Sequence, residues 1–575
     1  MMTAGEQWST MLREFFVFDP KAPFIFTSVL FWIFFAGVLA VNGIIHKRLL
    51  IRNLFLFAVS IFFYYKTTGL FFLLLVYTAA WDYFMAILIR RTEVEWKRKS
   101  WLILSVVMNL GVLFYFKYAY FFTDAYNTIA GTNYPVFNWL AYWSNGFFGT
   151  HFTVSKILLP IGISFFTFQS ISYTVEVYRR QLEPLRRFTD YAFFVSFFPQ
   201  LVAGPIVRAS EFIPQINKPY QLTRDMLGLG IFWILNGLIK KIILSDYLAK
   251  QLIDRVFENP AVYTGFENLL AIFGYSLQVY ADFSGYTDIA IGVALLMGFH
   301  LSANFNSPYK ATNVSDFWRR WHISLSTWLR DYVYIPLGGN QKGSIVSYLL
   351  LGFFVALIAL LSQSWLVLSA SAGVLAVLLL TALLVPRFRA WLNTNLNLML
   401  TMLLGGFWHG ASWNFMIWGG LNGLGLVFYK SWKKISPWGD TTKWYFRAWS
   451  IFLTFSFISF TRVWFRSGSS NSWNDMEKTH DISEEFTSAL VMLDRIFLGM
   501  DISVIPRVLG TYWNVALVFA VGMIIHWLPV HVKEDYRRRF VALPYWAMTL
   551  ICFVAVVLVY QVLSAGAQPF IYFQF

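Results

Sequence analysis

The chain has 575 residues, of which 58% are hydrophobic, 20% aromatic and only 13% charged. Because soluble domains carry roughly 25% charged residues, this composition excludes a water-soluble globular fold of such length. The net charge of +15 does not indicate nucleic-acid binding, since the basic residues form short clusters between apolar runs, as in the cytoplasmic loops of membrane proteins. We therefore predict an all-α, polytopic transmembrane protein whose partner is the lipid bilayer and not nucleic acid.

Apolar runs long enough to cross a bilayer core of about 30 Å recur along the whole chain. The expected spans cover residues 24–45, 49–65, 70–89, 102–122, 227–244, 345–361, 365–384, 444–465, 513–528 and 547–563. Two further apolar stretches, 158–175 and 191–206, are interrupted by proline and glycine. Broken helices at membrane depth are tolerated where protein or a water-filled cavity covers the freed backbone. These two stretches are therefore predicted to line an interior space, with ordinary kinked helices as the alternative.

The sequence contains neither an internal repeat nor a separate soluble domain, so residues 1–575 are predicted to form one integral membrane domain. Its core covers about residues 20–465, with a polar outer loop at 467–483 and an aromatic C-terminal tail at 568–575. The positive-inside rule assigns the basic clusters at 90–99 and 533–539 to the cytoplasmic side. Counting spans outward from these clusters predicts that both termini lie on the outer face.

The segment 282–340 is too polar to span a membrane and too aromatic to be a free loop, so we expect re-entrant and interfacial helices. Ionisable groups at that depth are costly and indicate function. Arg319 and Arg320 carry planar donors suited to the phosphates of an anionic donor substrate, and Asp316 would pair with either arginine. Contact with lipid headgroups is the alternative for the arginines. His322 stands in the same cationic and aromatic cluster.

His409 lies in a glycine-rich apolar stretch that covers residues 398–428. A neutral imidazole accepts and donates a proton near physiological pH, as a general base must. The alternative is a structural histidine hydrogen-bonded to a neighbouring carbonyl. A metal site is not expected, because Cys552 is the only cysteine and the chain has no His-Glu-x-x-His motif.

The aromatic tail 568–575 directly follows the last apolar run and contains one good nucleophile, the hydroxyl of Tyr572. By the predicted topology this tail lies on the outer face of the membrane. The alternative for Tyr572 is a residue of the aromatic belt at the membrane interface.

Several motifs together resemble those of the bacterial alginate O-acetyltransferase group within the membrane-bound O-acyltransferase superfamily. They occupy segments 159–169, 198–206, 282–286, 304–305, 317–331 and 405–412, in the order expected for that group. The resemblance covers most of residues 20–465. It departs from the group in one place, where two additional apolar runs between 345 and 385 separate the two histidine motifs. We expect these runs to form a peripheral hairpin that leaves the topology downstream unchanged.

The resemblance implies a ring of helices in which an inner and an outer funnel meet near His409. The donor would be acetyl-CoA, used as a substrate from the cytoplasmic side, with no bound cofactor. His409 would deprotonate the acceptor hydroxyl, and His322 would assist orientation or charge. The residues expected to contact substrate are Arg319, Arg320, Asp316, Trp408, Ser412 and Asn304.

Related systems carry a similar aromatic tail whose tyrosine resembles an acyl relay. The resemblance therefore implies that Tyr572 passes the acyl group to an extracytoplasmic SGNH-type O-acetyltransferase partner, which acetylates a polysaccharide. The expected location is the bacterial inner membrane. Two alternatives remain open from the sequence, namely transfer of D-alanyl or another acyl group to an envelope polymer, and a transporter or flippase without chemistry.

Overall fold

The structure is a computed structural model that describes residues 13, 15–19, 24–149, 152–201, 204–362, 364–436, 443–468, 482–563 and 571. In these residues all regular structure is helical and there is no strand. Five helices are long and apolar enough to cross a membrane, or up to seven if each of two sharply bent helix pairs counts as one span. The predicted all-α, multi-pass architecture is confirmed.

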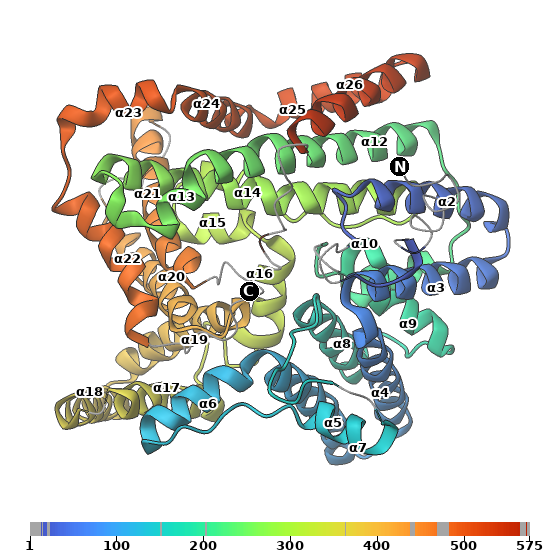
Figure 1. Cartoon of the computed structure of the whole chain (residues 1–575). Helices are drawn as coiled ribbons and strands as arrows, with labels where there is room; N and C mark the ends of the chain where they lie inside the picture. Colours follow the sequence, from blue (N-terminus) through green and yellow to red (C-terminus); the bar gives the residue numbers. More distant parts are fainter. Residues whose placement is uncertain are drawn as a thin grey trace.

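The N-terminal third supplies the helices that lie right and below in Figure 1. They are α2 (Val29–Ile45), α3 (Leu49–Thr68), η1 (Gly69–Phe71), α4 (Phe72–Arg91), α5 (Glu95–Leu113), η2 (Phe114–Tyr118), α6 (Ala119–Ala130) and α7 (Trp139–Phe148). Helix α2 begins later than the predicted residue 24. Ser28 precedes it and caps it by accepting a hydrogen bond from the Phe31 N–H at 3.2 Å.

The two stretches interrupted by proline and glycine form short, buried helices. Nearly every residue of α8 (Ile163–Tyr178) is buried, and so are α9 (Phe188–Ser196) and α10 (Phe198–Leu201). Gly162 precedes α8 with a φ of +80°, a backbone conformation that glycine adopts without a steric penalty. These segments thus belong to the protein interior, which fits both the predicted lining of an interior space and the alternative of packed, kinked helices.

The centre of the molecule is built on α14 (Gly265–Leu296), which is 32 residues long and runs beside α12 (Arg224–Leu238) in Figure 1. A Cβ atom added to Gly285 of α14 would lie 2.8 Å from the carbonyl oxygen of Gly237. The two helices therefore approach through glycine, which is typical of membrane helix pairs. Short elements complete this region, namely α11 (Ala209–Ile216), η3 (Ile239–Asp246), η4 (Ala249–Ile253), α13 (Asp254–Glu258) and η5 (Pro260–Val262).

Three short elements after α14 lie near the middle of Figure 1. They are α15 (Val314–Arg320), α16 (Ile323–Leu329) and η7 (Arg330–Tyr334), preceded by η6 (Pro308–Lys310). None of them is long enough to cross a bilayer, since a span needs roughly 20 residues.

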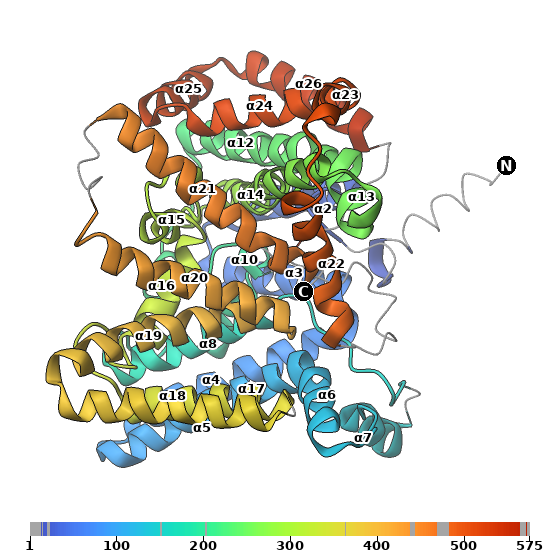
Figure 2. The same cartoon turned by 90° about the vertical axis from the view of Figure 1, so that its left-hand side faces the viewer.

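The two additional apolar runs form α17 (Ile345–Leu361) and α18 (Trp365–Leu384), which lie at the lower edge of both views (Figures 1 and 2). Only 6% of the apolar window of α18 is buried inside the protein. The base of this hairpin is clasped by Asn397, whose Nδ2 donates to the carbonyls of Gly339 and Lys342 at 3.0 Å each. Ser347 donates from its hydroxyl to Asn397 Oδ1 at 2.8 Å.

Helices α19 (Pro386–His409) and α20 (Trp413–Trp432) pack closely as an antiparallel pair. The later helices are α21 (Trp444–Ser467), α22 (Ile482–Phe497), η8 (Ile502–Val504), α23 (Ile505–Thr511), α24 (Trp513–Trp527), α25 (Val530–Ala542) and α26 (Tyr545–Leu563). The last three form the upper edge of Figures 1 and 2. Of the predicted polar loop 467–483, residues 469–481 lie outside the described residues, and so does the predicted tail 568–575 except for Ile571.

Candidate active site

His409 is the last residue of α19, and its neighbours satisfy the end of that helix. The final carbonyls of a helix have no partner within it. Here the Lys117 ammonium donates to the carbonyls of Trp408 at 2.7 Å and His409 at 2.9 Å. The Tyr118 hydroxyl donates to the Phe407 carbonyl at 2.9 Å. A cation at a helix C-terminus also offsets the negative end of the helix dipole, so Lys117 stabilises the position of His409 in two ways.

The imidazole of His409 is enclosed by aromatic rings, and only 4% of the residue is exposed. Its ring centre lies 4.8 Å from that of Trp408, 5.1 Å from that of Trp418 and 5.2 Å from that of Phe465. Each ring meets the imidazole edge to face. Such surroundings exclude bulk water and fix the ring plane, as expected of a group that exchanges a proton with a bound substrate.

His322 is fully buried and also lies near Trp408. Its ring centre is 6.2 Å from that of Trp408 and 4.6 Å from that of Phe283. Its Nδ1 is 3.2 Å from Oδ1 of Asn304. Two buried histidines from distant segments thus approach a single tryptophan, and they are close enough to interact electrostatically.

His322 adopts an unusual backbone conformation, with a φ of +43°. This left-handed region costs a non-glycine residue roughly 1–2 kcal/mol. Asn304 holds the turn, because its main-chain carbonyl accepts from the Ile323 N–H at 2.9 Å and its Oδ1 accepts from the Ser324 N–H at 3.1 Å. Strained residues cluster at functional sites, where the surrounding structure determines them.

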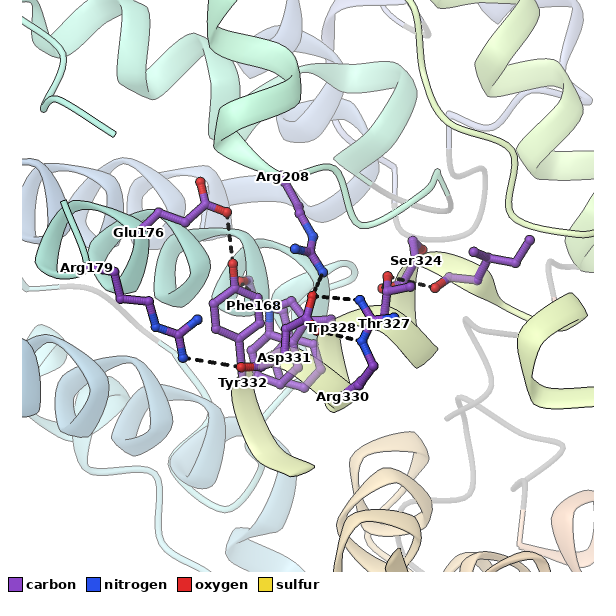
Figure 3. A network of polar contacts seen from close by, with 11 residues as sticks. Phe168, Glu176, Arg179, Arg208, Ser324, Thr327, Trp328, Arg330, Asp331 and Tyr332 are labelled. Atoms are coloured by element: carbon purple, nitrogen blue, oxygen red, sulfur yellow. Dashed lines mark hydrogen bonds and ion pairs between the residues drawn. The ribbon is translucent and has the colours of Figure 1, made fainter. Parts of the chain in front are cut away.

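A polar network joins η7, the element that follows His322 and α16, to α8 (Figure 3). Asp331 accepts hydrogen bonds from Arg330 and forms an ion pair with Arg208, while Tyr332 donates to Glu176 at 2.8 Å. Partial burial alone would raise the pKa of Asp331, but the hydrogen bonds from Arg330 and Arg208 outweigh it, so the pKa lies below its usual value. The carboxylate therefore stays charged at neutral pH.

Ring stacking reinforces the same connection. Trp328 of α16 stacks on Phe168 of α8 with ring centres 3.7 Å apart, and its Nε1 donates to the Phe168 carbonyl at 3.0 Å. Phe168 in turn stacks on Trp408, with ring centres 5.3 Å apart. The three aromatic rings therefore connect α8, α16 and the end of α19 into one support for both histidines.

Comparison with known proteins identifies the family. A sequence profile of the membrane-bound O-acyltransferase family matches residues 186–358. A peptidoglycan O-acetyltransferase from Helicobacter pylori is 35% identical over 448 residues, which are 73% of this chain and 72% of that protein. The chain belongs to the membrane-bound O-acyltransferase family. It is therefore an acyltransferase and a multi-pass membrane protein, and a transporter without chemistry is excluded.

Other members of the membrane-bound O-acyltransferase family are similar over shorter stretches. A "probable alginate O-acetylase" from Pseudomonas putida is 37% identical over 66% of this chain, which spans 65% of that relative. A teichoic acid D-alanyltransferase from Bacillus subtilis is 28% identical over 54% of this chain and 69% of that relative. The chain thus spans just under two thirds of the alginate relative.

The remaining residues predicted to bind substrate lie on elements beside the histidines. Arg320 pairs with Asp316 at 3.0 Å, and the side chain of Arg319 is exposed. In the described part of the chain, neither arginine hydrogen-bonds to a histidine. Ser412 is the cap of α20, where its hydroxyl accepts from the Asn414 N–H at 3.2 Å.

Among the described residues, no group of three or more His, Cys, Asp or Glu side chains is arranged to hold a metal ion.

Sequence reasoning missed two charged groups near the site. Lys117 lies within a predicted apolar span, and an isolated cation in such a run signals function. Lys241 is buried and forms ion pairs with Asp246 at 2.8 Å and Asp282 at 2.6 Å. Lys240 and Lys241 stand between Ile239 and Ile242 within the predicted span 227–244, so charge inside an apolar run was again the signal.

Replacing Lys117 by methionine tests the role assigned to it. The substitution keeps the length of the side chain but leaves the Trp408 and His409 carbonyls without their donor. We expect a loss of about 1–3 kcal/mol in stability and a lower rate of acyl transfer, measured by thermal unfolding and by an activity assay on the same preparation. Tyr118→Phe is the matched control, because it removes only the bond to the Phe407 carbonyl and should cost less. Unchanged stability and rate in Lys117→Met would contradict this role.

Proposed function

We propose that this acyltransferase takes an acetyl group from cytoplasmic acetyl-CoA and delivers it across the bacterial inner membrane for O-acetylation of an extracytoplasmic polysaccharide. An SGNH-type partner would carry out the final transfer, and both termini would lie on the outer face. The relatives support acetyl as the transferred group, since those named O-acetyltransferase or O-acetylase are 35% and 37% identical to this chain, whereas the D-alanyltransferase is 28% identical. Transfer of D-alanyl is the second candidate.

The observation that carries this proposal is the approach of two buried imidazoles, His322 and His409, to one tryptophan, Trp408. Acyl transfer from a thioester to an alcohol needs a base for the hydroxyl proton and an enclosed site that excludes water. His409 accepts the proton of the attacking hydroxyl as the new C–O bond forms. The C–S bond of the thioester then breaks, and the departing thiolate takes a proton, which His409 returns.

Arg319, Arg320 and Asp316 are proposed to act on the donor. The exposed guanidinium of Arg319 suits the phosphates of coenzyme A. Arg320 is held by Asp316, which orients the planar donors of the guanidinium toward one side. Trp408 shapes the space between the histidines, and Ser412 fixes the start of α20 directly after His409.

The C-terminal tail is proposed to be the first acceptor. Ile571 is buried, with 4% of its surface exposed, and its main-chain N–H donates to Asp282 Oδ2 at 2.8 Å. The next residue in α14, Phe283, packs on His322. Tyr572 lies outside the described residues, but it directly follows Ile571 in the sequence. Its phenol oxygen would attack the acetyl carbonyl, forming an aryl ester that the partner then consumes.

Tyr572→Phe tests the relay. The variant lacks the hydroxyl that would carry the acetyl group but keeps the aromatic ring, so we expect normal folding and loss of polysaccharide acetylation. Intact-mass analysis of the C-terminal peptide, from cells without the partner, should find one acetyl group on the wild-type tail and none on the variant. Survival of polysaccharide acetylation in Tyr572→Phe, with no acetylated wild-type tail, would overturn the relay.

The choice of acyl group has its own test. Purified protein in liposomes is supplied on one side with acetyl-CoA carrying a labelled acetyl group, and the label released from the thioester or transferred to the tail is counted. Hydrolysis or transfer of the label supports acetyl-CoA as the donor. Failure with acetyl-CoA, together with transfer from a D-alanyl carrier, would favour the second candidate.

A further inference from the structure

The side-chain oxygen of Asn304 is the centre of a small buried cluster of hydrogen bonds. It lies 3.2 Å from Nδ1 of His322, 3.1 Å from the main-chain nitrogen of Ser324 and 2.9 Å from the hydroxyl oxygen of Ser324. Asn304 itself is 1% exposed. The main-chain carbonyl of Asn304 also accepts a hydrogen bond from the Ile323 N–H at 2.9 Å, which joins the same two segments through the main chain.

The direction of these hydrogen bonds follows from chemistry. Oxygen and nitrogen of an asparagine amide look alike in a structure and are assigned from their partners. The main-chain N–H of Ser324 can only donate, so the atom of Asn304 that it meets must be the carbonyl oxygen. That oxygen only accepts, and Nδ1 of His322 must therefore carry a hydrogen to bond with it.

The other ring nitrogen follows by elimination. A neutral imidazole has one N–H and one lone pair, so a hydrogen on Nδ1 leaves the lone pair on Nε2. The doubly protonated ring is disfavoured, because His322 is fully buried between the rings of Phe283 and Trp408 and burial penalises a charge. The ring is thus held as the tautomer whose Nε2 accepts a proton or a hydrogen bond.

We infer that Asn304 is the positioning residue of His322, which fixes the imidazole in its Nδ1–H tautomer and directs a basic Nε2 toward the acyl-transfer site. The catalytic part of this inference rests on the proposed function, while the tautomer itself does not. The resemblance implied that Asn304 contacts substrate, whereas this role acts through His322. In functional histidines generally, the hydrogen bond made by one ring nitrogen determines which nitrogen carries the proton.

The tautomer can be measured directly. Nitrogen NMR of protein labelled with ¹⁵N-histidine distinguishes a ring nitrogen that bears hydrogen from one that does not. Subtracting the spectrum of a His322→Gln variant assigns the signals of His322. We expect hydrogen on Nδ1 and a lone pair on Nε2 in the wild-type protein. Hydrogen on Nε2 in the wild type would overturn the inference, whatever the variants do.

Three variants separate positioning from a purely structural role. Asn304→Asp keeps an oxygen that accepts from Nδ1 and should keep the tautomer. Asn304→Leu has a similar volume without the acceptor and should give a mixture of tautomers. Ser324→Ala removes a donor to the same oxygen but leaves the bond to His322, so its tautomer should be that of the wild type. A single Nδ1–H tautomer in folded Asn304→Leu would also overturn the inference.

Acyl transfer provides the second readout. In Asn304→Leu the rate should fall toward the loss of about 10²–10⁴ that follows removal of a general acid–base group, and in Asn304→Asp most of the rate should return. If the tautomers behave as expected but the rates do not change, the positioning is correct and the proposed role of His322 in acyl transfer is wrong. Equal losses in Ser324→Ala and Asn304→Leu would indicate a structural role for Asn304 and overturn its assignment as a positioning residue.

Discussion

Replacing His409 by alanine is expected to lower the rate of acyl transfer by on the order of 10²–10⁴, the contribution of a positioned general base. The ring is enclosed by Trp408, Trp418 and Phe465, so water entering the vacated space has no fixed orientation toward the substrate. The rate is measured with purified protein as transfer from the acyl donor. In cells, the expected result is loss of O-acetylation on envelope and secreted glycans.

Two controls make the result interpretable. His300→Ala removes an exposed imidazole. Among the described residues His300 forms hydrogen bonds through its main chain alone, so the rate of this variant should equal that of the wild type. Thermal unfolding of His409→Ala should remain cooperative, which excludes misfolding as the cause. A folded His409→Ala protein that transfers acyl groups at the wild-type rate would remove the basis of the proposed mechanism.

The substitution Gly406→Ala, which adds a single methyl group, is expected to have the largest effect on the position of His409. A Cβ atom at this residue would lie 3.0 Å from Cα of Gly419 and still closer to the Phe415 carbonyl oxygen, both backbone atoms of α20. Backbone atoms cannot rotate away as a side chain does, so α19 and α20 must separate. Overpacking of this kind costs about 1–3 kcal/mol, and His409 lies three residues beyond Gly406.

We therefore expect Gly406→Ala to lower both the melting temperature and the rate of acyl transfer. Gly420→Ala is a matched control in the same helix pair, because its Cβ would meet only the Cδ2 atom of Leu403 at 3.6 Å, an ordinary contact. The control should keep the melting temperature and the rate of the wild type. Equal behaviour of the two alanine variants would show that the close approach of the helices does not position His409.

Much of the fold could be predicted from the sequence, because hydrophobic runs of span length are a direct signature of membrane helices. The limits of α17 and α18 agree with the apolar runs 345–361 and 365–384. The predicted start at residue 24 is too early for α2, which begins at Val29. Apolar residues continue upstream of Ser28, and only the capping hydrogen bond of Ser28 reveals where the helix begins.

The geometry of the candidate site is harder to predict from the sequence. His322 and His409 each stand out as polar residues in apolar surroundings, but their approach to one tryptophan depends on how α8, α16 and α19 pack. The contribution of Asn304 depends on a turn at His322 with positive φ, for which histidine is an unusual residue. The bond between Ile571 and Asp282 runs through a main-chain N–H, which no side-chain pattern encodes.

The clasp formed by Asn397 ties the base of the outer hairpin to the middle of α19. Only 6% of the apolar window of α18 is buried, whereas Phe354 of α17 packs with Leu400 and Met416 in the core beside α19. Substitutions on the exposed surface of α18 are consequently expected to cost the fold little. The sequence of α18 can therefore follow the demands of lipid thickness or neighbouring proteins more freely than that of α17.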